Sequence, residues 1–254
     1  MARALPGQAR TLTGVDFGAE FLNQNQALGD IIVDADPGTP VPTCPGWAFK
    51  QLFRHVGKGN RWAAQIVGDR MQDALAFADI RDGRAPSDPA AARAWFAEGA
   101  QLLVDAVAEV GPETQVWTFT GPKPASWWLR RRLHEVLVHR ADAAVALGAE
   151  FAPRPELAAD ALSEWFDLVV TRMPDLAGRR VHLHASDDGL GEAGEWTIGN
   201  GGWAHAHGKG DVALRGPATD LLLVTTGRRR VGDTAVEVFG DERLLTTWLD
   251  GMKF

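Results

Sequence analysis

The sequence predicts an α+β protein with two domains: a four-helix bundle over residues 1–152 and a smaller domain with a mixed sheet over residues 153–254. Up to about residue 150, apolar side chains recur at the spacing of amphipathic helices. After the proline-rich segment FAPRP at 151–155, short segments follow in which polar and apolar residues alternate, as they do in strands. This change of period places the domain boundary.

The N-terminal domain should contain four helices of about 15 to 25 residues, separated by breakers such as Gly111-Pro112. Pro45 suits the first turn of the second helix, with Thr43 or Cys44 near its cap. Four helices joined by loops favour a bundle, whose interior is a common place for a metal site. The predicted helices cover residues 13–34, 45–70, 87–110 and 126–148.

The C-terminal domain should be a small α+β unit that begins with one helix and continues with short strands. Two further helices are expected between and after the strands. The predicted helices are 156–172, 220–226 and 241–249, and the predicted strand segments are 181–184, 196–198, 203–214 and 234–239.

Composition narrows the possible functions and partners. A net charge of −7 and a pI near 5.5 argue against nucleic acid or an anionic membrane as the main partner. No stretch approaches the roughly 20 apolar residues of a membrane span. Cys44 is the single cysteine, which excludes an internal disulfide and fits a reducing cytoplasm. The chain has no tyrosine, so a general acid must be sought among histidines, carboxylates, arginines or a metal-bound water.

Glu135 and His139 stand four residues apart in the fourth predicted helix. Residues at this spacing lie on one face, one turn apart, so both side chains can reach one ion. With His55 from the second helix they would form a site of two histidines and one carboxylate with an open position, which suggests catalysis more than a closed structural site. His134 lies five residues before His139, about 140° around the helix, so these two histidines cannot clasp an ion together.

The same residues have a simpler interpretation. A glutamate four residues before a histidine is usually a helix surface pair worth a few tenths of a kcal/mol. A single histidine such as His55 is more often just partly buried and hydrogen-bonded. The pair Glu135 and His139 lies beside the main apolar stripe of its helix, so spacing alone does not show that it is buried.

Other candidates near this pair have local explanations. Cys44 is expected to pack locally, because nothing near it in sequence supplies a base for a thiolate. Asp142 could orient His139, or it could pair with Arg131 or Arg140.

Two histidine pairs occur in the C-terminal domain. His205 and His207 alternate on a predicted strand, as do His182 and His184, so each pair shares a face. A pair of this kind can bind a metal, but no third ligand is evident for either. Solvated faces are therefore the expected account.

Five segments give the chain a family resemblance that spans nearly its whole length. The chain resembles the maleylpyruvate isomerase-like, mycothiol-dependent enzymes of the DinB-like metal-binding superfamily. The matching segments are 41–47 (VPTCPGW), 52–57 (LFRHVG), 131–142 (RRLHEVLVHRAD), 220–228 (DLLLVTTGR) and 236–241 (VEVFGD).

The resemblance implies a DinB-like bundle with three protein ligands to a divalent ion, usually zinc, and these correspond to His55, Glu135 and His139. It also implies that the C-terminal domain helps to close the active site, and that Arg228 corresponds to the arginine of the family's L-L-x-x-x-G-R segment. We expect this guanidinium to take part in catalysis by binding a carboxylate. One departure is the segment 58–62 (KGNRW), where the family often has further aromatic or histidine residues.

The function implied is that of a cytoplasmic, metal- and mycothiol-dependent isomerase or S-transferase acting on a small, anionic substrate. A divalent cation stabilises a thiolate, so a bound small-molecule thiol would serve as the nucleophile without a catalytic cysteine. Addition of the thiolate to an activated double bond permits rotation before elimination, whereas an S-transferase would use the thiolate once. The alternatives are a hydrolase with a metal-activated water and a non-catalytic metal- or ligand-binding protein. The expected partners are the substrate and a low-molecular-weight thiol, and the expected state is a monomer or small homo-oligomer.

Overall fold

The computed structural model describes residues 15–199 and 201–252. Within this part, the chain divides into two compact units, Val15–Phe151 and the residues from Ala152 onward. The first is mostly helical and the second carries a sheet, which confirms the predicted α+β class. The predicted start of the first helix at residue 13 lies outside the described residues.

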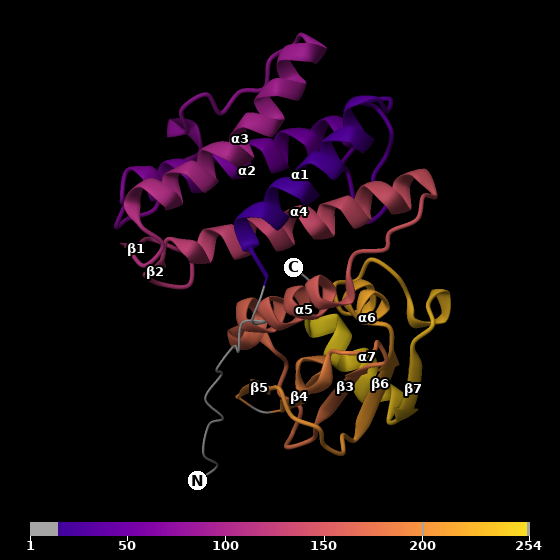
Figure 1. Ribbon diagram of the computed structural model, residues 1–254. Coiled ribbons are helices and arrows are strands. Elements are labelled where there is room, and N and C mark those ends of the chain that lie inside the picture. The colour runs from indigo at the N-terminus through magenta and orange to yellow at the C-terminus, as the bar shows by residue number, and fades with distance from the viewer. Residues whose placement is uncertain (1–14, 200, 253–254) are drawn as a thin grey trace. The chain divides into compact units, whose positions relative to one another are not determined.

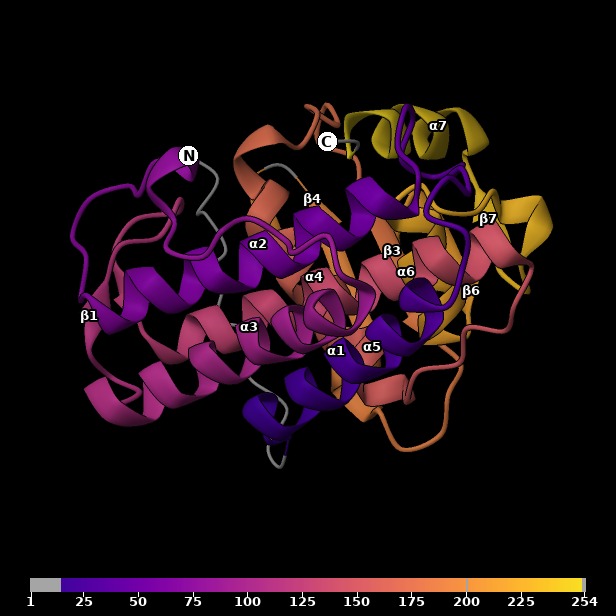
Figure 2. The same cartoon turned by 90° about the horizontal axis from the view of Figure 1, so that it is seen from above.

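Four long helices build the first unit. α1 packs against α3 and α4, and α2 also packs against α3 and α4, so that the helices run alongside one another (Figures 1 and 2). Asp16 and Asp88 cap α1 and α3 by accepting hydrogen bonds from the backbone amides three residues on. Gly148, in the left-handed conformation with φ 63°, ends α4. The bounds are α1 Phe17–Val33, α2 Phe49–Gly68, α3 Pro89–Val110 and α4 Ser126–Leu147.

The prediction for the start of α2 was wrong by four residues, since α2 begins at Phe49 and not at Pro45. Pro40 and Ala48 form an isolated β-bridge, which closes a loop over residues 40–48. Gly46 has φ +81° in this loop, a conformation that cannot continue a helix. The loop therefore holds Trp47 outside the helix. A short hairpin of β1 Gln115–Val116 and β2 Lys123–Pro124, which was not predicted, joins α3 to α4.

The second unit opens with one helix and then forms a five-stranded mixed sheet in the order β5-β4-β3-β6-β7. β3 and β6 are parallel, and the other neighbours are antiparallel. The strands are β3 Val181–Ala185, β4 Glu195–Gly199, β5 Gly202–Ala204, β6 Val212–Gly216 and β7 Glu237–Gly240. The α-helices are α5 Pro155–Val169, α6 Ala218–Thr225 and α7 Glu242–Gly251. Short 3-10 helices lie at Phe77–Asp79, Val170–Arg172, Gly191–Gly194 and Val231–Asp233.

The helices of this unit provide the apolar partners of the sheet. Trp196 of β4 donates a hydrogen bond from its indole to Ser163 of α5, 3.0 Å away, and is fully buried. Phe166 of α5 packs against both Trp203 of β5 and Trp248 of α7. Because side chains alternate along a strand, the residues on either side of Trp196 face away from these helices.

The predicted strand over 203–214 is two strands separated by a loop, because β5 ends at Ala204 and β6 starts at Val212. The loop packs closely on β3: a Cβ at Gly210 would meet the amide nitrogen of His182 at 2.9 Å. His205 and His207 therefore lie in a loop, which corrects their predicted placement on one strand. Among the described helices, none combines the length and the apolar character that are needed to cross a membrane.

Candidate metal centre

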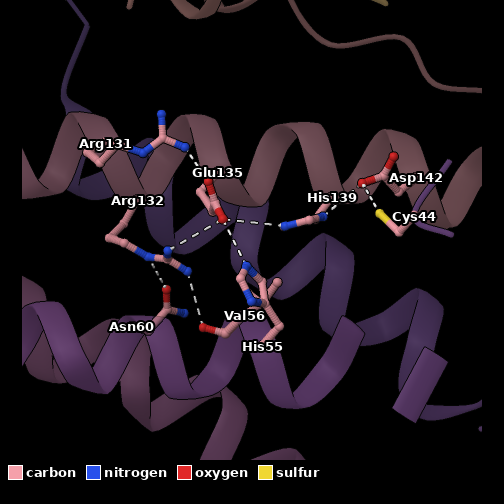
Figure 3. Close-up of polar contacts among 9 residues, drawn as sticks. All are labelled: Cys44, His55, Val56, Asn60, Arg131, Arg132, Glu135, His139 and Asp142. Atoms are coloured by element: carbon pink, nitrogen blue, oxygen red, sulfur yellow. Dashed lines mark hydrogen bonds and ion pairs between the residues drawn. The ribbon is translucent and has the colours of Figure 1, made fainter. Parts of the chain in front are cut away.

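His55 of α2 and Glu135 and His139 of α4 come together inside the first unit (Figure 3). The potential ligand atoms of the three side chains lie within 4.8 Å of one another. The Nε2 atoms of both histidines face the same carboxylate oxygen, with His55 Nε2 3.0 Å and His139 Nε2 3.4 Å from Glu135 Oε1. The predicted trio therefore converges on one point between two helices.

Two arginines hold the glutamate from the other side. Arg131 donates a short hydrogen bond to Glu135 Oε2 from one turn earlier on α4. Arg132 lies across α2, where it donates to Asn60 Oδ1 at 2.9 Å and to the Val56 carbonyl at 3.2 Å (Figure 3). Its guanidinium is 3.9 Å from Glu135 Oε1. From the sequence, Arg131 was named only as a possible partner of Asp142 and Arg132 was given no role, although both stand in the segment that carries the family resemblance.

His139 is fixed by a buried carboxylate behind it. Asp142 Oδ2 lies 2.8 Å from His139 Nδ1. Asp142 is fully buried and also accepts hydrogen bonds from Thr43 Oγ1 at 2.6 Å and from Cys44 Sγ at 3.4 Å. The orienting role considered for Asp142 is thus present. Cys44, which was expected only to pack locally, belongs to the same network because the loop before α2 carries it there.

These contacts shift the pKa values of the central pair in opposite directions. Burial alone would raise the pKa of Glu135, but the Arg131 guanidinium and hydrogen bonds with His139 and His55 hold it well below its ordinary value. Burial alone would lower the pKa of His139, but hydrogen bonds with Asp142, Cys44 and Glu135 raise it to about 10. Without a metal, the pair is therefore an imidazolium facing a carboxylate at neutral pH.

Trp47 covers one side of the centre. Its ring lies 4.9 Å from that of His55 and is stacked on that of His139 at 6.1 Å, measured between ring centroids. The indole therefore limits the rotation of both imidazoles. Sequence reasoning placed Trp47 only within a matching segment, because the turn at Gly46 that aims it toward α4 depends on contacts along the whole loop.

The donor set suits a divalent metal. Two imidazole nitrogens and one carboxylate oxygen are ligands that Zn²⁺ binds, usually with a position left for water or substrate in catalytic sites. Histidine ligands commonly donate their second N–H to a carboxylate, as His139 can to Asp142. The His55 side chain is 39% exposed, so the centre is open to solvent on the α2 side. His134 is buried elsewhere on α4 and is not part of this group.

A cavity lined by basic side chains lies against α2. It has a volume of about 780 Å³ and is lined by residues of α2 and of the segment 83–87. Arg54 and Lys58, one turn apart on α2, and Arg84 bring three cations to its wall. None of the three proposed metal ligands lines this cavity.

Arg228 belongs to the second unit, where it follows Gly227 just after α6. Its Nη1 donates to the Thr226 carbonyl at 2.8 Å, and the side chain is partly exposed, whereas Arg229 and Arg230 are exposed. The orientation of Arg228 toward the metal centre stays a prediction.

The structure corrects the expectation that the C-terminal histidines lack a third ligand. His182, His184 and His207 converge on Glu195. Sequence reasoning treated these histidines as two separate pairs, and the glutamate was not considered.

Comparisons with known proteins give a consistent result. The family model "Mycothiol maleylpyruvate isomerase N-terminal domain" matches residues 19–144, and the "MDMPI C-terminal domain" matches residues 156–247. The crystal structure of a mycothiol-dependent maleylpyruvate isomerase is 17% identical with a TM-score of 0.60, and a histidine-to-alanine mutant is 16% identical with the same score. Each alignment covers 88% of this chain and 91% of that chain, and at this identity the likeness shows a shared fold.

A search of curated protein sequences finds no match. The two family matches follow one another along the chain and take in both units, from α1 to α7. The chain belongs to the mycothiol-dependent maleylpyruvate isomerase family.

Proposed function

We propose that this protein is a mycothiol-dependent isomerase or S-transferase that uses a divalent metal, most simply Zn²⁺, held by His55, Glu135 and His139. One observation carries the proposal. Two imidazole Nε2 atoms face the same oxygen of Glu135, and the second nitrogen of His139 lies against the buried Asp142. This arrangement presents three metal ligands with their partners already in place.

The side chains around the centre have separate tasks. A divalent ion there would stabilise the thiolate form of a small thiol at neutral pH. Asp142 holds the proton at His139 Nδ1, so that Nε2 faces the centre. Arg131 fixes the orientation of Glu135, and Trp47 keeps water from one side of both imidazoles. The exposed edge of His55 leaves the path by which a thiol would approach.

The proposed substrate is a small anion that carries at least one carboxylate. The cavity on α2 has Arg54, Lys58 and Arg84 in its wall, and these cations suit a carboxylate of the substrate or of mycothiol. Arg228 is proposed as a further cation that binds a substrate carboxylate through two parallel hydrogen bonds, which lysine cannot reproduce.

The test is metal analysis of the purified protein followed by assays with a dicarboxylate that carries an activated cis double bond. We expect isomerisation or thiol addition only when mycothiol is present. Glu135→Gln and His55→Ala should each lose bound metal and lower turnover by at least about 100-fold, because each removes a ligand. Glu109→Gln, an exposed glutamate of α3, is the matched control and should change neither.

Three results would contradict parts of the proposal. Unchanged metal content in Glu135→Gln would remove the metal assignment. Equal turnover with and without mycothiol would point to the hydrolase alternative, in which water replaces the thiol. Stable metal binding without turnover of any thiol-dependent substrate would support a non-catalytic binding protein.

A further inference from the structure

Four potential metal ligands meet on the face of the C-terminal sheet opposite Trp196. His182 and His184 lie two residues apart on β3, and Glu195 of β4 is the cross-strand partner of His184. His207 reaches the same point from the loop between β5 and β6. Their donor atoms all lie within 4.8 Å of one another. We propose that these four residues form a binding site for a divalent transition metal ion, independent of the centre in the bundle.

The carboxylate of Glu195 is the focus of the cluster. Its Oε1 lies 2.6 Å from His184 Nδ1 and 3.1 Å from His207 Nδ1. Its Oε2 lies 2.8 Å from His182 Nε2. One carboxylate thus lies beside a nitrogen of each of three imidazoles. A simple hydrogen-bonded pair would need only one of them.

The contact between His182 and Glu195 suits a cation bound to both side chains. The Thr197 hydroxyl donates its proton to the Ala206 carbonyl at 2.8 Å, so toward His182 Nδ1, 3.4 Å away, it can only accept. When a neutral imidazole donates to this hydroxyl, its proton lies on Nδ1, and the lone pair on Nε2, 2.8 Å from Glu195 Oε2, can bind a cation. Within the described residues, Glu195 Oε2 is buried and has no hydrogen-bond partner despite the 2.8 Å separation.

In that tautomer, the lone pairs of His182 Nε2 and Glu195 Oε2 repel each other unless a cation lies within reach of both. A metal ion satisfies the nitrogen and the oxygen together. The same ion would draw on His184 and His207, which face the other oxygen.

The local structure holds these donors in place. The loop that carries His207 is tied to β4 by the bond from Thr197 to Ala206. Gly210 brings the loop against β3, because a Cβ there would clash with the backbone of His182. His182 is 5% exposed as a result, whereas the His207 side chain is 81% exposed. The site therefore has a buried floor and one solvent-facing ligand.

The donor types select the metal. Imidazole nitrogens suit Zn²⁺, Ni²⁺ or Cu²⁺, whereas Ca²⁺ and Mg²⁺ require oxygen ligands. Four protein ligands would complete the tetrahedral coordination of zinc, as in structural sites. The ion would then fasten β3, β4 and the loop after β5 to one another.

The experiment uses the full chain without an affinity tag, stripped by a chelator and titrated with ZnCl₂ by calorimetry. The background variant His55→Ala disables the bundle centre. It should still bind one equivalent of zinc, and binding should raise its melting temperature. His184→Ala or His207→Ala in this background should weaken that binding at least about tenfold. His205→Gln, a histidine of the same loop outside the cluster, should not weaken it.

Retention of the remaining zinc equivalent by the His184→Ala and His207→Ala variants would overturn the proposal, as would the absence of zinc binding in His55→Ala. His207 is mostly exposed, so its replacement tests the site without disturbing the core. The number of zinc ions bound by the wild type separates the two centres. If the wild type binds two equivalents and His184→Ala binds one, both centres are supported. If the wild type binds one equivalent and His184→Ala binds none, only the sheet site is supported.

Discussion

His139 in the bundle and His182 in the sheet are both buried histidines beside a carboxylate, yet their pKa values move in opposite directions. His139 lies between two carboxylates, Asp142 and Glu135, which favour its charged form over the cost of burial. His182 shares the single carboxylate of Glu195 with two other imidazoles, so burial decides. Burial is the largest single influence on both pKa values. The two carboxylates around His139 together outweigh it, whereas the one carboxylate that His182 shares with two imidazoles does not.

The largest expected effect is on the stability of the metal-free protein. The pKa of His139 is about 10 in the folded protein, against an ordinary value of 6.5, so protonation favours the folded state. This contribution is complete below about pH 6.5 and is lost as the pH rises toward 10. We expect the free energy of unfolding, measured with chelator present, to fall by on the order of a few kcal/mol over this range.

His139→Gln should flatten that decline, and an unchanged slope would show that His139 does not cause it.

His182 in the sheet should change the free energy of unfolding with pH in the opposite direction. The pKa of His182 is lowered on folding, so its contribution is present above about pH 6.5 and is lost as the pH falls. His182→Asn should therefore affect the acid side and leave the alkaline decline in place.

Asp142→Asn should lower zinc affinity at the bundle centre by up to about 100-fold, because the amide cannot hold His139 Nδ1–H as the carboxylate does. Zinc binding in the His184→Ala background, where only the bundle centre remains, measures this effect directly. Thr43→Val serves as the control for the network, since it removes one donor to Asp142 and keeps the carboxylate. An equal loss in both variants would mean that packing, and not charge, orients His139.

Thr197→Val should lower zinc affinity at the sheet site by roughly tenfold, the lower end of the range for groups that orient a ligand, because its contact with His182 is 3.4 Å long. The measurement is a zinc titration in the His55→Ala background. The bundle centre should be unaffected in otherwise wild-type protein. Reduced zinc binding at both sites would contradict the proposal that the sheet site is independent of the bundle centre.

The smallest expected effect is that of Arg228→Lys, which should reduce turnover or substrate affinity by roughly tenfold or less while metal content stays intact. Arg229→Lys, at an exposed neighbouring position, is the matched control. The measurement is steady-state kinetics of both variants, together with analysis of their metal content. Equal kinetics for wild type and Arg228→Lys would confine the chemistry to the bundle and leave the C-terminal domain with another role.

The bundle was more predictable from sequence than the sheet for a physical reason. Glu135 and His139 share one helix, so their spacing fixes their relative positions, and α4 extends over 126–147 against the predicted 126–148. In the sheet, the partner of His182 and His184 depends on the register between β3 and β4. Nothing in the local spacing of Glu195 reports that register.

Loop conformation was the other limit. Pro45 fits a helix start by composition, but the bridge from Pro40 to Ala48 delays the helix and directs Trp47 toward the histidines. The residue types suggested that His55 joins the pair on α4, but the support for this grouping came from the family resemblance, because no spacing rule relates two helices eighty residues apart. The role of these residues as metal ligands stays a prediction.

Gly59 lies in the segment 58–62, where the chain departs from the family pattern, and its lack of a side chain makes room for Arg132. A Cβ at this position would lie 2.9 Å from the guanidinium of Arg132, which rests on α2 at that point. A side chain at position 59 would therefore need the space that the Arg132 guanidinium fills. Relatives that place a larger aromatic or histidine side chain at the position of Gly59 should lack the arginine, so the two positions should covary. In such relatives, the space that the Arg132 guanidinium fills here from α4 would be filled by a side chain of α2.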